Sequence, residues 1–401
     1  MKGDRRRQFI WNLLRFLLCF PLRVILGIKA KKYKLEKKKP YVILSNHVAQ
    51  IDPIYVAMSF KRHINYIAYA GVCYGKYKKV LNRYFAPIPK TKGKTDMMTI
   101  RESLKVMKKN GVLGLFPSGD CTFSGVESYI DPSIVKFLRM MKAEILLYRL
   151  DGVYGKSPRW AHKRTKGKMY GEVKRVITVD EMNAMSDEEL YNVVVNTIGG
   201  NSLDYIGDNL YKGKYCAEYL ERALYVCPDC KEIGTLISHK DTFSCASCGY
   251  KAVYKPNLHF ELVKGKNLME TVNDWYNYCI ESLKEKDQEK EFDTDEVIFK
   301  DQFEYLKTDQ LVKDEKGYTV KQEIICENGY VRLYKNRFVL ENSDGKEVAM
   351  LPLKHLKLIF HGKKNLVIYN EELTYTVHGF DRFCGMKYIH LVDNVLKNKI
   401  N

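Results

Sequence analysis

The sequence predicts an α/β domain with a mixed, largely parallel sheet flanked by helices, followed by a small cysteine-rich segment and a β-rich C-terminal domain. Strand-like apolar runs alternate with helical patterns between residues 41 and 148, and this alternation is typical of a parallel sheet. Two Cys-x-x-Cys pairs follow at residues 227–230 and 245–248, and short strand-like runs with turn signals fill residues 318–377. At 401 residues the chain is expected to hold two or three domains.

The charge is strongly positive and unevenly distributed. The net charge is +19, and residues 1–40 contribute 13 Lys and Arg against only Asp4 and Glu36. Such a basic block implies an anionic partner, either nucleic acid or a membrane surface. Its position around an apolar segment favours the membrane, so we expect no nucleic-acid partner. The cysteine pattern and the lack of a recognisable cleavable signal favour a reducing cytosolic compartment.

An apolar segment at residues 9–28 lies inside the basic block and is about long enough to span a bilayer. Arg15 and Arg23 interrupt it and Pro21 breaks it, so a spanning helix would bury two costly charges. We therefore expect residues 1–34 to anchor in the membrane interface, with the arginines reaching headgroups and both ends at the cytoplasmic face. The alternative is an ordinary apolar helix docked on the core.

The stretch Tyr41–Pro53 carries the strongest candidate for chemistry. Its apolar run predicts a buried strand, and Asp52 followed by Pro53 predicts a helix start with Asp52 at the N-cap. His47 then lies in a strand-to-helix loop at the carboxyl edge of the sheet, where α/β folds present reactive groups. A histidine oriented by a carboxylate can take a proton from a hydroxyl. The alternative is that Asp52 only caps the helix and His47 is an ordinary polar residue.

The alternation of strands and helices continues through the first domain. Apolar runs and helical periodicity predict, in chain order, a strand at 64–70, a helix at 96–110, a strand at 112–116, a helix at 133–141 and a strand at 143–148. A second Asp-Pro pair, Asp131-Pro132, marks the start of the helix at 133–141.

Three short motifs follow one another in this region. They are Asn46-His47-x4-Asp52, Ile88-Pro89-x-x-Lys92 and Phe116-Pro117-Ser118-Gly119. Together they resemble the glycerolipid and lysophospholipid acyltransferase family, typified by 1-acylglycerol-3-phosphate acyltransferases. The resemblance covers roughly residues 35–200, and the ordered set is much more specific than the first motif alone.

The resemblance implies transfer of a fatty acyl group from a thioester donor, acyl-ACP or acyl-CoA, to a hydroxyl of a lysophospholipid or glycerol-phosphate-type acceptor. His47 would be the general base, and Asp52 would hold its imidazole in one tautomer and stabilise the charged form. The hydroxyl would attack the thioester directly. The implied substrate-binding residues are Asn46, Lys90, Lys92, Ser118, Gly119, Asp120 and Arg159. For the lysines, a solvated basic loop is the alternative.

The chain departs from the family pattern after the Phe-Pro pair. The family usually continues Glu-Gly-Thr-Arg, with Glu and Arg helping to hold the acceptor's phosphate, whereas this chain has Ser-Gly-Asp-Cys at residues 118–121. Lys92 stands where Arg is usual and lacks its bidentate fork. Two interpretations follow: an active enzyme with a different acceptor, favoured because His47 and Asp52 are both present, or a catalytically weakened lipid-binding or scaffold protein. Cys121 is expected to be a plain small residue, because nothing electropositive adjoins it in sequence.

Four cysteines, Cys227, Cys230, Cys245 and Cys248, form the pattern C-x2-C-x14-C-x2-C. Two such pairs place four thiolates on two tight turns, a complete tetrahedral ligand set for Zn²⁺ that leaves no position for water. We therefore expect a structural zinc in a segment that resembles a zinc ribbon, residues 224–254. A redox dithiol pair is the alternative. Protein docking or a spacer role is favoured over nucleic-acid binding, because no basic-aromatic stripe lies between the pairs.

The C-terminal third is predicted to be mainly β. A helix at 267–283 and a charged, mobile linker at 284–296 precede eight short β runs and a last helix at 385–398. The first three β runs are at 318–320, 323–326 and 329–334. An antiparallel meander closed by a helix resembles the pleckstrin-homology-like fold, which suggests regulation through lipid or protein binding.

The expected organisation has five segments, and the expected localisation is the cytoplasmic face of the cell membrane, peripheral or monotopic. The segments are a membrane anchor at 1–34, an acyltransferase-like α/β domain at 35–200, a zinc ribbon at 224–254, a helix and linker at 255–296 and a pleckstrin-homology-like domain at 297–401.

Overall fold

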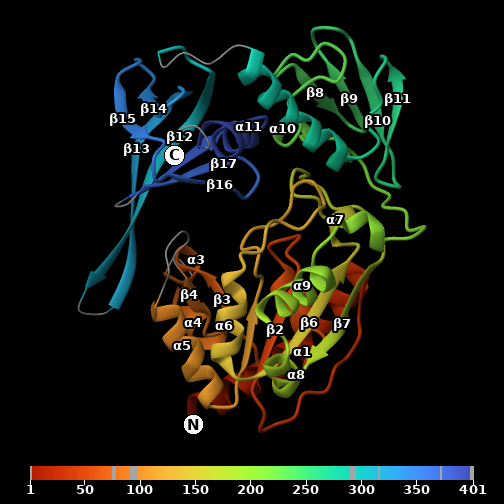
Figure 1. Cartoon of the computed structure of the whole chain (residues 1–401), viewed down its shortest axis with the longest axis vertical. Coiled ribbons are helices and arrows are strands. Elements are labelled where there is room, and N and C mark those ends of the chain that lie inside the picture. Colours follow the sequence, from red (N-terminus) through yellow and green to blue (C-terminus); the bar gives the residue numbers. More distant parts are fainter. Residues whose placement is uncertain are drawn as a thin grey trace. The chain divides into compact units, whose positions relative to one another are not determined.

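The chain forms two compact units (Figure 1). A computed structural model describes residues 2–74, 78–90, 97–289, 295–314, 317–370 and 373–397. The first unit comprises residues 1–159 and 165–212, and the second comprises residues 160–164 and 213–401.

The first unit is built on a seven-stranded sheet. Its strands are β1 (Ile28–Ala30), β2 (Tyr41–Ser45), β3 (Asn65–Tyr69), β4 (Ile88–Lys90), β5 (Val112–Leu115), β6 (Glu144–Asp151) and β7 (Met169–Ile177). The strand order is β1-β7-β6-β2-β5-β3-β4. Only the β6–β7 pair is antiparallel among the described strands of this sheet, and the other neighbours are parallel. The predicted mixed, largely parallel sheet is therefore confirmed.

Helices cover this sheet and follow its strands in the chain (Figure 1). They are α1 (Lys2–Leu26), α2 (Asp52–Ala57), α3 (Ala70–Tyr74), α4 (Lys78–Tyr84), α5 (Met97–Lys108), α6 (Ser133–Met141), α7 (Val153–Lys156), α8 (Val179–Ala184) and α9 (Asp187–Ile198), with a 3₁₀ turn at Ser202–Tyr205. The helix predicted at 133–141 matches α6 at both ends, and α5 lies within the predicted 96–110.

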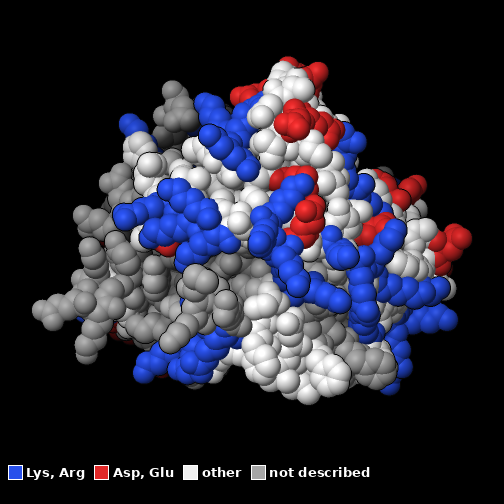
Figure 2. Space-filling view, turned by 90° about the horizontal axis from the view of Figure 1, so that it is seen from below, with Lys and Arg blue, Asp and Glu red and all other residues white. Residues whose placement is uncertain are grey.

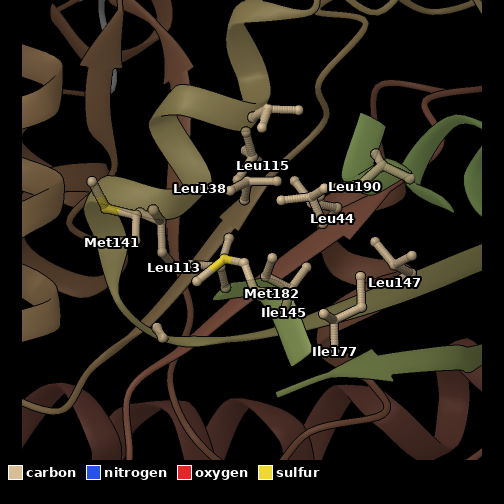
Figure 3. Packing of buried hydrophobic residues seen from close by; sticks show 14 of the residues in the cluster. Leu44, Leu113, Leu115, Leu138, Met141, Ile145, Leu147, Ile177, Met182 and Leu190 are labelled. Carbon is tan, nitrogen blue, oxygen red and sulfur yellow. The ribbon is translucent and has the colours of Figure 1, made fainter. Parts of the chain in front are cut away.

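The main core of this unit lies between the sheet and helices α5, α6, α8 and α9 (Figure 3). Leu44 of β2, Leu113 of β5 and Leu147 of β6 face Leu138 of α6 and Leu190 of α9 across it. All five residues of β2 are buried, which is typical of a central parallel strand covered on both faces. This burial fixes the position at which β2 ends and the next loop begins.

Helix α1 contains the apolar segment predicted to anchor the chain. Among the residues that the structure describes, no helix is long and apolar enough to cross a membrane. Gln8 fastens α1 to the chain after α2: its side chain donates to Lys61 O over 2.9 Å and accepts from His63 N over 3.0 Å. Several apolar side chains of the helix nevertheless face solvent, including Phe16, which is 82% exposed.

The second unit begins with the cysteine-rich segment, which forms a four-stranded antiparallel sheet. Its strands are β8 (Leu236–His239), β9 (Thr242–Cys245), β10 (Lys251–Tyr254) and β11 (Phe260–Lys264), and helix α10 (Val272–Glu289) follows. Trp275 of α10 is fully buried against Phe243, Tyr250 and Phe260. The helix and the small sheet therefore share one aromatic core.

A seven-stranded antiparallel sheet completes the second unit. Its strands are β12 (Phe299–Asp314), β13 (Gly317–Leu333), β14 (Arg337–Asn342), β15 (Glu347–Pro352), β16 (Lys357–His361), β17 (Asn365–Tyr369) and β18 (Thr374–Gly379), in the order β15-β14-β13-β12-β18-β17-β16. Helix α11 (Met386–Leu391) and a π-helical turn (Val392–Leu396) end the described chain. The predicted β-rich C-terminal domain is confirmed, whereas its pleckstrin-homology-like character stays a prediction.

Two sequence-based expectations for this unit are wrong. The segment 284–296 is not a linker throughout, because α10 continues to Glu289; residues 290–294 lie outside the described part. The three β runs predicted between 318 and 334 are a single strand, β13, and its long partner β12 was not predicted.

Candidate active site

The loop that joins β2 to α2, residues 46–51 (hereafter the histidine loop), lies at the carboxyl edge of the sheet. β2 runs parallel to both of its neighbours, β5 and β6, so all three strands end at this edge. The side chain of Asn46 binds the backbone of Leu150 twice, donating to its carbonyl over 2.9 Å and accepting from its N–H over 2.8 Å. Asn46, predicted to bind substrate, thus fastens the start of the loop to β6.

Within this loop the imidazole of His47 and the carboxylate of Asp52 are hydrogen-bonded. Nδ1 of His47 lies 3.0 Å from Oδ2 of Asp52. The same oxygen accepts the backbone N–H groups of Val48 over 2.6 Å and Ala49 over 2.8 Å. Asp52 is fully buried, and no hydrogen-bond partner is found for its Oδ1 in the described part of the chain. One carboxylate therefore fixes both the imidazole and the loop that carries it.

The prediction that Asp52 caps helix α2 is wrong. The helix begins at Asp52 itself, Ile51 occupies the N-cap position, and no side chain caps the first turn. The carboxylate points back to the preceding loop because two amides and an imidazole N–H compete for it there. Pro53 still occupies the first turn, where its missing N–H costs nothing.

A second segment, residues 118–127 (hereafter the 118–127 loop), fastens the backbone of His47 on both sides. The carboxylate of Glu127 accepts the His47 N–H with both oxygens at 3.1 Å, and the Thr122 N–H donates to the His47 carbonyl over 3.2 Å. Ser118 Oγ donates to Glu127 Oε1 over 2.6 Å. Sequence reasoning missed Glu127. The sequence does contain a signal for it. The Phe-Pro motif lacks its usual Glu, and Glu127 is the one acidic residue between Asp120 and Asp131 that could replace it.

The environment of Glu127 favours its neutral form. Burial raises the pKa of this carboxyl to about 7, although the hydrogen bonds from Ser118 and from the His47 N–H lower it. Near neutral pH this carboxyl group is therefore divided between its two charge states, and it is hydrogen-bonded to the backbone of the candidate base.

Cys121, expected to be a plain small residue because nothing electropositive adjoins it in sequence, lies against His47 in the structure. Its Sγ is 3.5 Å from Nε2 and 3.6 Å from Nδ1 of the imidazole. Burial by itself lowers the pKa of His47, but Cys121 and Asp52 offset this and raise it to about 10. Phe116 stacks on the same ring with centroids 4.4 Å apart. The imidazole is thus held by an aromatic ring, a carboxylate and a thiol.

The other predicted site residues lie around this centre. Asp120 accepts from the Cys121 N–H over 2.9 Å and pairs with Arg159, whose Nη2 is 3.4 Å from its Oδ1. Arg159 also donates to the Cys121 carbonyl. Gly119 has a φ of +70°, so a side chain there would be strained.

The two predicted lysines are placed less fully. Lys90 is exposed at the end of β4, on the outer strand of the same carboxyl edge. Lys92 lies outside the described residues.

A separate group of four cysteines in the second unit is arranged to hold a metal ion. The sulfur atoms of Cys227, Cys230, Cys245 and Cys248 all lie within 4.8 Å of one another, and two of the pairs are separated by 3.6 and 3.7 Å. Four thiolates around Zn²⁺, each at about 2.3 Å, would be roughly 3.8 Å apart, so these cysteines fit the ion.

Comparison with known proteins places the first unit. Residues 28–147 match the family model described as Acyltransferase. This stretch is an acyltransferase-family domain. The match includes His47, Asp52 and the Phe-Pro-Ser-Gly motif and covers less than half of the chain. A comparison with curated proteins finds no match.

One solved structure similar to this chain is that of the 1-acyl-sn-glycerophosphate (LPA) acyltransferase PlsC from Thermotoga maritima. The sequence identity is 16%, the match covers 49% of this chain and 79% of that chain, and the TM-score is 0.41.

Replacing Glu127 by Gln is expected to remove a pH-dependent loss of stability. Because the pKa of Glu127 in the folded protein, about 7, exceeds its ordinary value of 4.5, the folded state binds the proton more tightly than the unfolded state. The free energy of unfolding of the wild type therefore falls as pH rises from 4.5 to about 7. The Gln variant lacks this contribution, so its stability relative to the wild type should rise over that range by up to about 3 kcal/mol.

Denaturant unfolding at a series of pH values measures this difference. The exposed Glu188 supplies a matched control, since Glu188→Gln should show no such rise. A difference between Glu127→Gln and wild type that stays constant over the range would contradict a buried carboxyl with a raised pKa.

Proposed function

We propose that the chain is a membrane-surface O-acyltransferase that moves a fatty acyl group from a thioester donor to a hydroxyl of a glycerolipid-type acceptor. The donor is acyl-ACP or acyl-CoA, and the acceptor is a lysophospholipid or a related glycerol phosphate. The observation that carries the proposal is the His47–Asp52 hydrogen bond of 3.0 Å within a domain of the acyltransferase family.

In this mechanism His47 removes the proton of the acceptor hydroxyl through Nε2, because Nδ1 is engaged by Asp52. The buried carboxylate holds the ring in one orientation and stabilises the imidazolium that forms. Glu127 and Thr122 bind the backbone N–H and carbonyl of His47, and these hydrogen bonds fix the position of the ring at the edge of the sheet. Lys90 supplies positive charge for a phosphate at the same edge.

The altered motif at residues 118–121 supports an acceptor different from that of typical family members. The Arg that holds phosphate in the family is replaced by Cys121, and Arg159, which donates to the Cys121 carbonyl, is paired with Asp120. These two charges offset each other, so this part of the site adds little positive potential for an acceptor phosphate. The carboxylate that the motif lacks at Ser118 is supplied nearby by Glu127, which argues against a site that has simply decayed.

Exposed apolar and basic side chains support action at a membrane surface. Phe9, Leu13, Phe16 and Leu17 follow one face of α1 at helical spacing, and each is at least 46% exposed. Exposed lysines follow the helix at positions 29, 31, 32, 34, 37 and 38, and Figure 2 shows broad groups of Lys and Arg on one face of the molecule. Apolar side chains would enter the interface while the lysines bind anionic headgroups. We place the protein at the cytoplasmic face of the cell membrane.

For the second unit we propose one structural Zn²⁺ per chain. Cys227, Cys230, Cys245 and Cys248 would hold it, and four thiolates leave no open position for catalysis. Local backbone geometry suits such a site, because Lys231 and Gly249, each directly after a cysteine pair, adopt left-handed φ angles of +58° and +74°. The ion would tie the two turns together and contribute to folding of the small sheet.

Replacing His47 by Ala is expected to lower the rate of acyl transfer by about 10²–10⁴-fold without unfolding the protein. The assay follows labelled palmitoyl-CoA and palmitoyl-ACP against lysophosphatidate, lysophosphatidylglycerol and glycerol 3-phosphate. The exposed His239 supplies the control, and His239→Ala should keep wild-type turnover. Equal turnover in His47→Ala would refute the role of this base, and vesicle binding with no wild-type turnover would favour a lipid-binding protein.

Replacing Phe16 by Glu is expected to weaken binding to vesicles of phosphatidylcholine and phosphatidylglycerol by roughly tenfold or more, because burial of a Phe side chain contributes about 1.5–3 kcal/mol. Co-sedimentation measures the binding. Met350, 51% exposed on β15, is the matched control, and Met350→Glu should bind like the wild type. Unchanged binding of Phe16→Glu would rule out α1 as the anchor.

Metal analysis of the purified chain is expected to find one zinc per molecule. The double variant Cys230→Ser/Cys245→Ser should lose the metal and unfold at a lower temperature, whereas Cys216→Ser, outside the group, should keep it. A folded wild-type protein free of metal under reducing conditions would refute the site.

A further inference from the structure

Three residues of the candidate site form an arrangement that a direct transfer does not need. Cys121 Sγ lies against the ring of His47, 3.5 Å from Nε2 and 3.6 Å from Nδ1, and Nδ1 lies 3.0 Å from Asp52. A thiol next to an imidazole that a carboxylate orients supplies the parts of an activated nucleophile, in which the imidazole takes the thiol proton. The resemblance to the family places Arg at the position where this chain has Cys121.

We propose that Cys121 is a catalytic nucleophile that accepts the acyl group, so that transfer proceeds through a thioester on the protein. The inference rests on the proposed acyl transfer and adds a covalent intermediate to it.

In the first step the Cys121 thiolate attacks the carbonyl carbon of the donor thioester. A bond forms between Sγ and the acyl carbon, and the bond between that carbon and the donor sulfur breaks. The proton that His47 took from Cys121 passes to the departing thiolate, which leaves as the free thiol of CoA or of the carrier protein. The products are acyl-Cys121 and a neutral imidazole, and no oxidant or further reactant is required.

In the second step the acceptor hydroxyl attacks acyl-Cys121. His47 takes the hydroxyl proton, the ester bond forms, and the bond between the acyl carbon and Sγ breaks. The proton on His47 then pairs with the released Cys121 thiolate, which restores the starting state. One thioester and one hydroxyl have become one thiol and one ester.

This sequence also resolves a difficulty of the direct mechanism. Although burial lowers it, the pKa of His47 is raised to about 10 by Cys121 and Asp52, so in the resting protein the ring favours its charged form, which cannot act as a base. Acylation consumes the free thiol of Cys121 and removes one of the two groups that raise the pKa of His47. The pKa of the imidazole then falls toward the range in which the ring can take the proton of the acceptor hydroxyl.

The backbone around the thiol is fixed on both sides. Asp120 accepts the Cys121 N–H over 2.9 Å, and Arg159 donates to its carbonyl. The sulfur is therefore held against the ring, although only 7% of the residue is exposed. Cys73, in the same unit, supplies a control thiol: its Sγ donates to the carbonyl of Ala68 over 3.8 Å, and burial raises the pKa of this thiol to about 12.

The decisive experiment is isotope exchange in the absence of any acceptor. The full-length protein is incubated with palmitoyl-CoA and labelled CoA, and in parallel with palmitoyl-ACP and labelled ACP. A covalent intermediate regenerates the donor from the labelled thiol, whereas direct transfer cannot do so. We expect exchange in the wild type and in Cys73→Ser, and at least a hundredfold slower exchange in Cys121→Ala. Acid-quenched wild type should carry one palmitoyl group on Cys121 that neutral hydroxylamine removes.

The outcomes separate this inference from the proposed function. Transfer to an acceptor without exchange, together with turnover of Cys121→Ala within twofold of the wild type, would overturn the covalent route and leave the acyltransferase intact. Exchange without transfer to any acceptor would support acyl-Cys121 and contradict the glycerolipid acceptor. Neither exchange nor transfer would refute both. Because exchange is measured on the wild type, the test does not depend on the folding of a variant.

Discussion

A single carboxylate oxygen organises the candidate site. Oδ2 of Asp52 receives three N–H groups, one from the imidazole of His47 and two from the backbone of the histidine loop. A buried carboxylate is costly unless it is hydrogen-bonded, so these donors are required for the charge to remain at this depth. The orientation of the ring and the path of the loop are therefore set by the same atom, and neither can change without the other.

The 118–127 loop complements this arrangement from the other side. Glu127 and Thr122 hold the N–H and the carbonyl of His47, while Cys121 contacts the ring itself. Ser118, where the family pattern has Glu, donates a hydrogen bond to the carboxylate of Glu127, nine residues further along the chain.

The architecture of the first unit could be predicted because its signals are local. Continuous apolar runs marked β2 and β5, and Asp131-Pro132 marked the start of α6. Strand β12 was missed because Phe299, Phe303 and Leu306, its buried apolar residues, are spaced by four and three positions. This spacing resembles the periodicity of a helix. The three-residue step arises because irregularities in the strand register between residues 303 and 307 turn Phe303 and Leu306 to the same face.

The two residues proposed to carry the chemistry could be predicted from the sequence, but the residues that surround them could not. The pair His47 and Asp52 lies within one loop, so its residue types and spacing were visible in the sequence. Glu127 and Cys121 reach His47 from 80 and 74 residues away, and only the parallel pairing of β2 with β5 brings them there. The predicted capping role of Asp52 was wrong for a related reason. An Asp before a Pro usually accepts N–H groups from the helix turn that follows it, whereas the N–H groups that bind this carboxylate belong to the loop that precedes it.

The attachment of His47 to the 118–127 loop also bears on how the protein is made. The histidine loop is synthesised early, but the groups that hold its backbone follow 75 and 80 residues later. Contacts of such long sequence separation form only after the intervening chain has closed. Helix α1, with its exposed apolar face, emerges from the ribosome before any of them. Under the membrane attachment proposed above, α1 would be free to bind a lipid surface before the backbone of His47 is held in place, so attachment would come before completion of the candidate site.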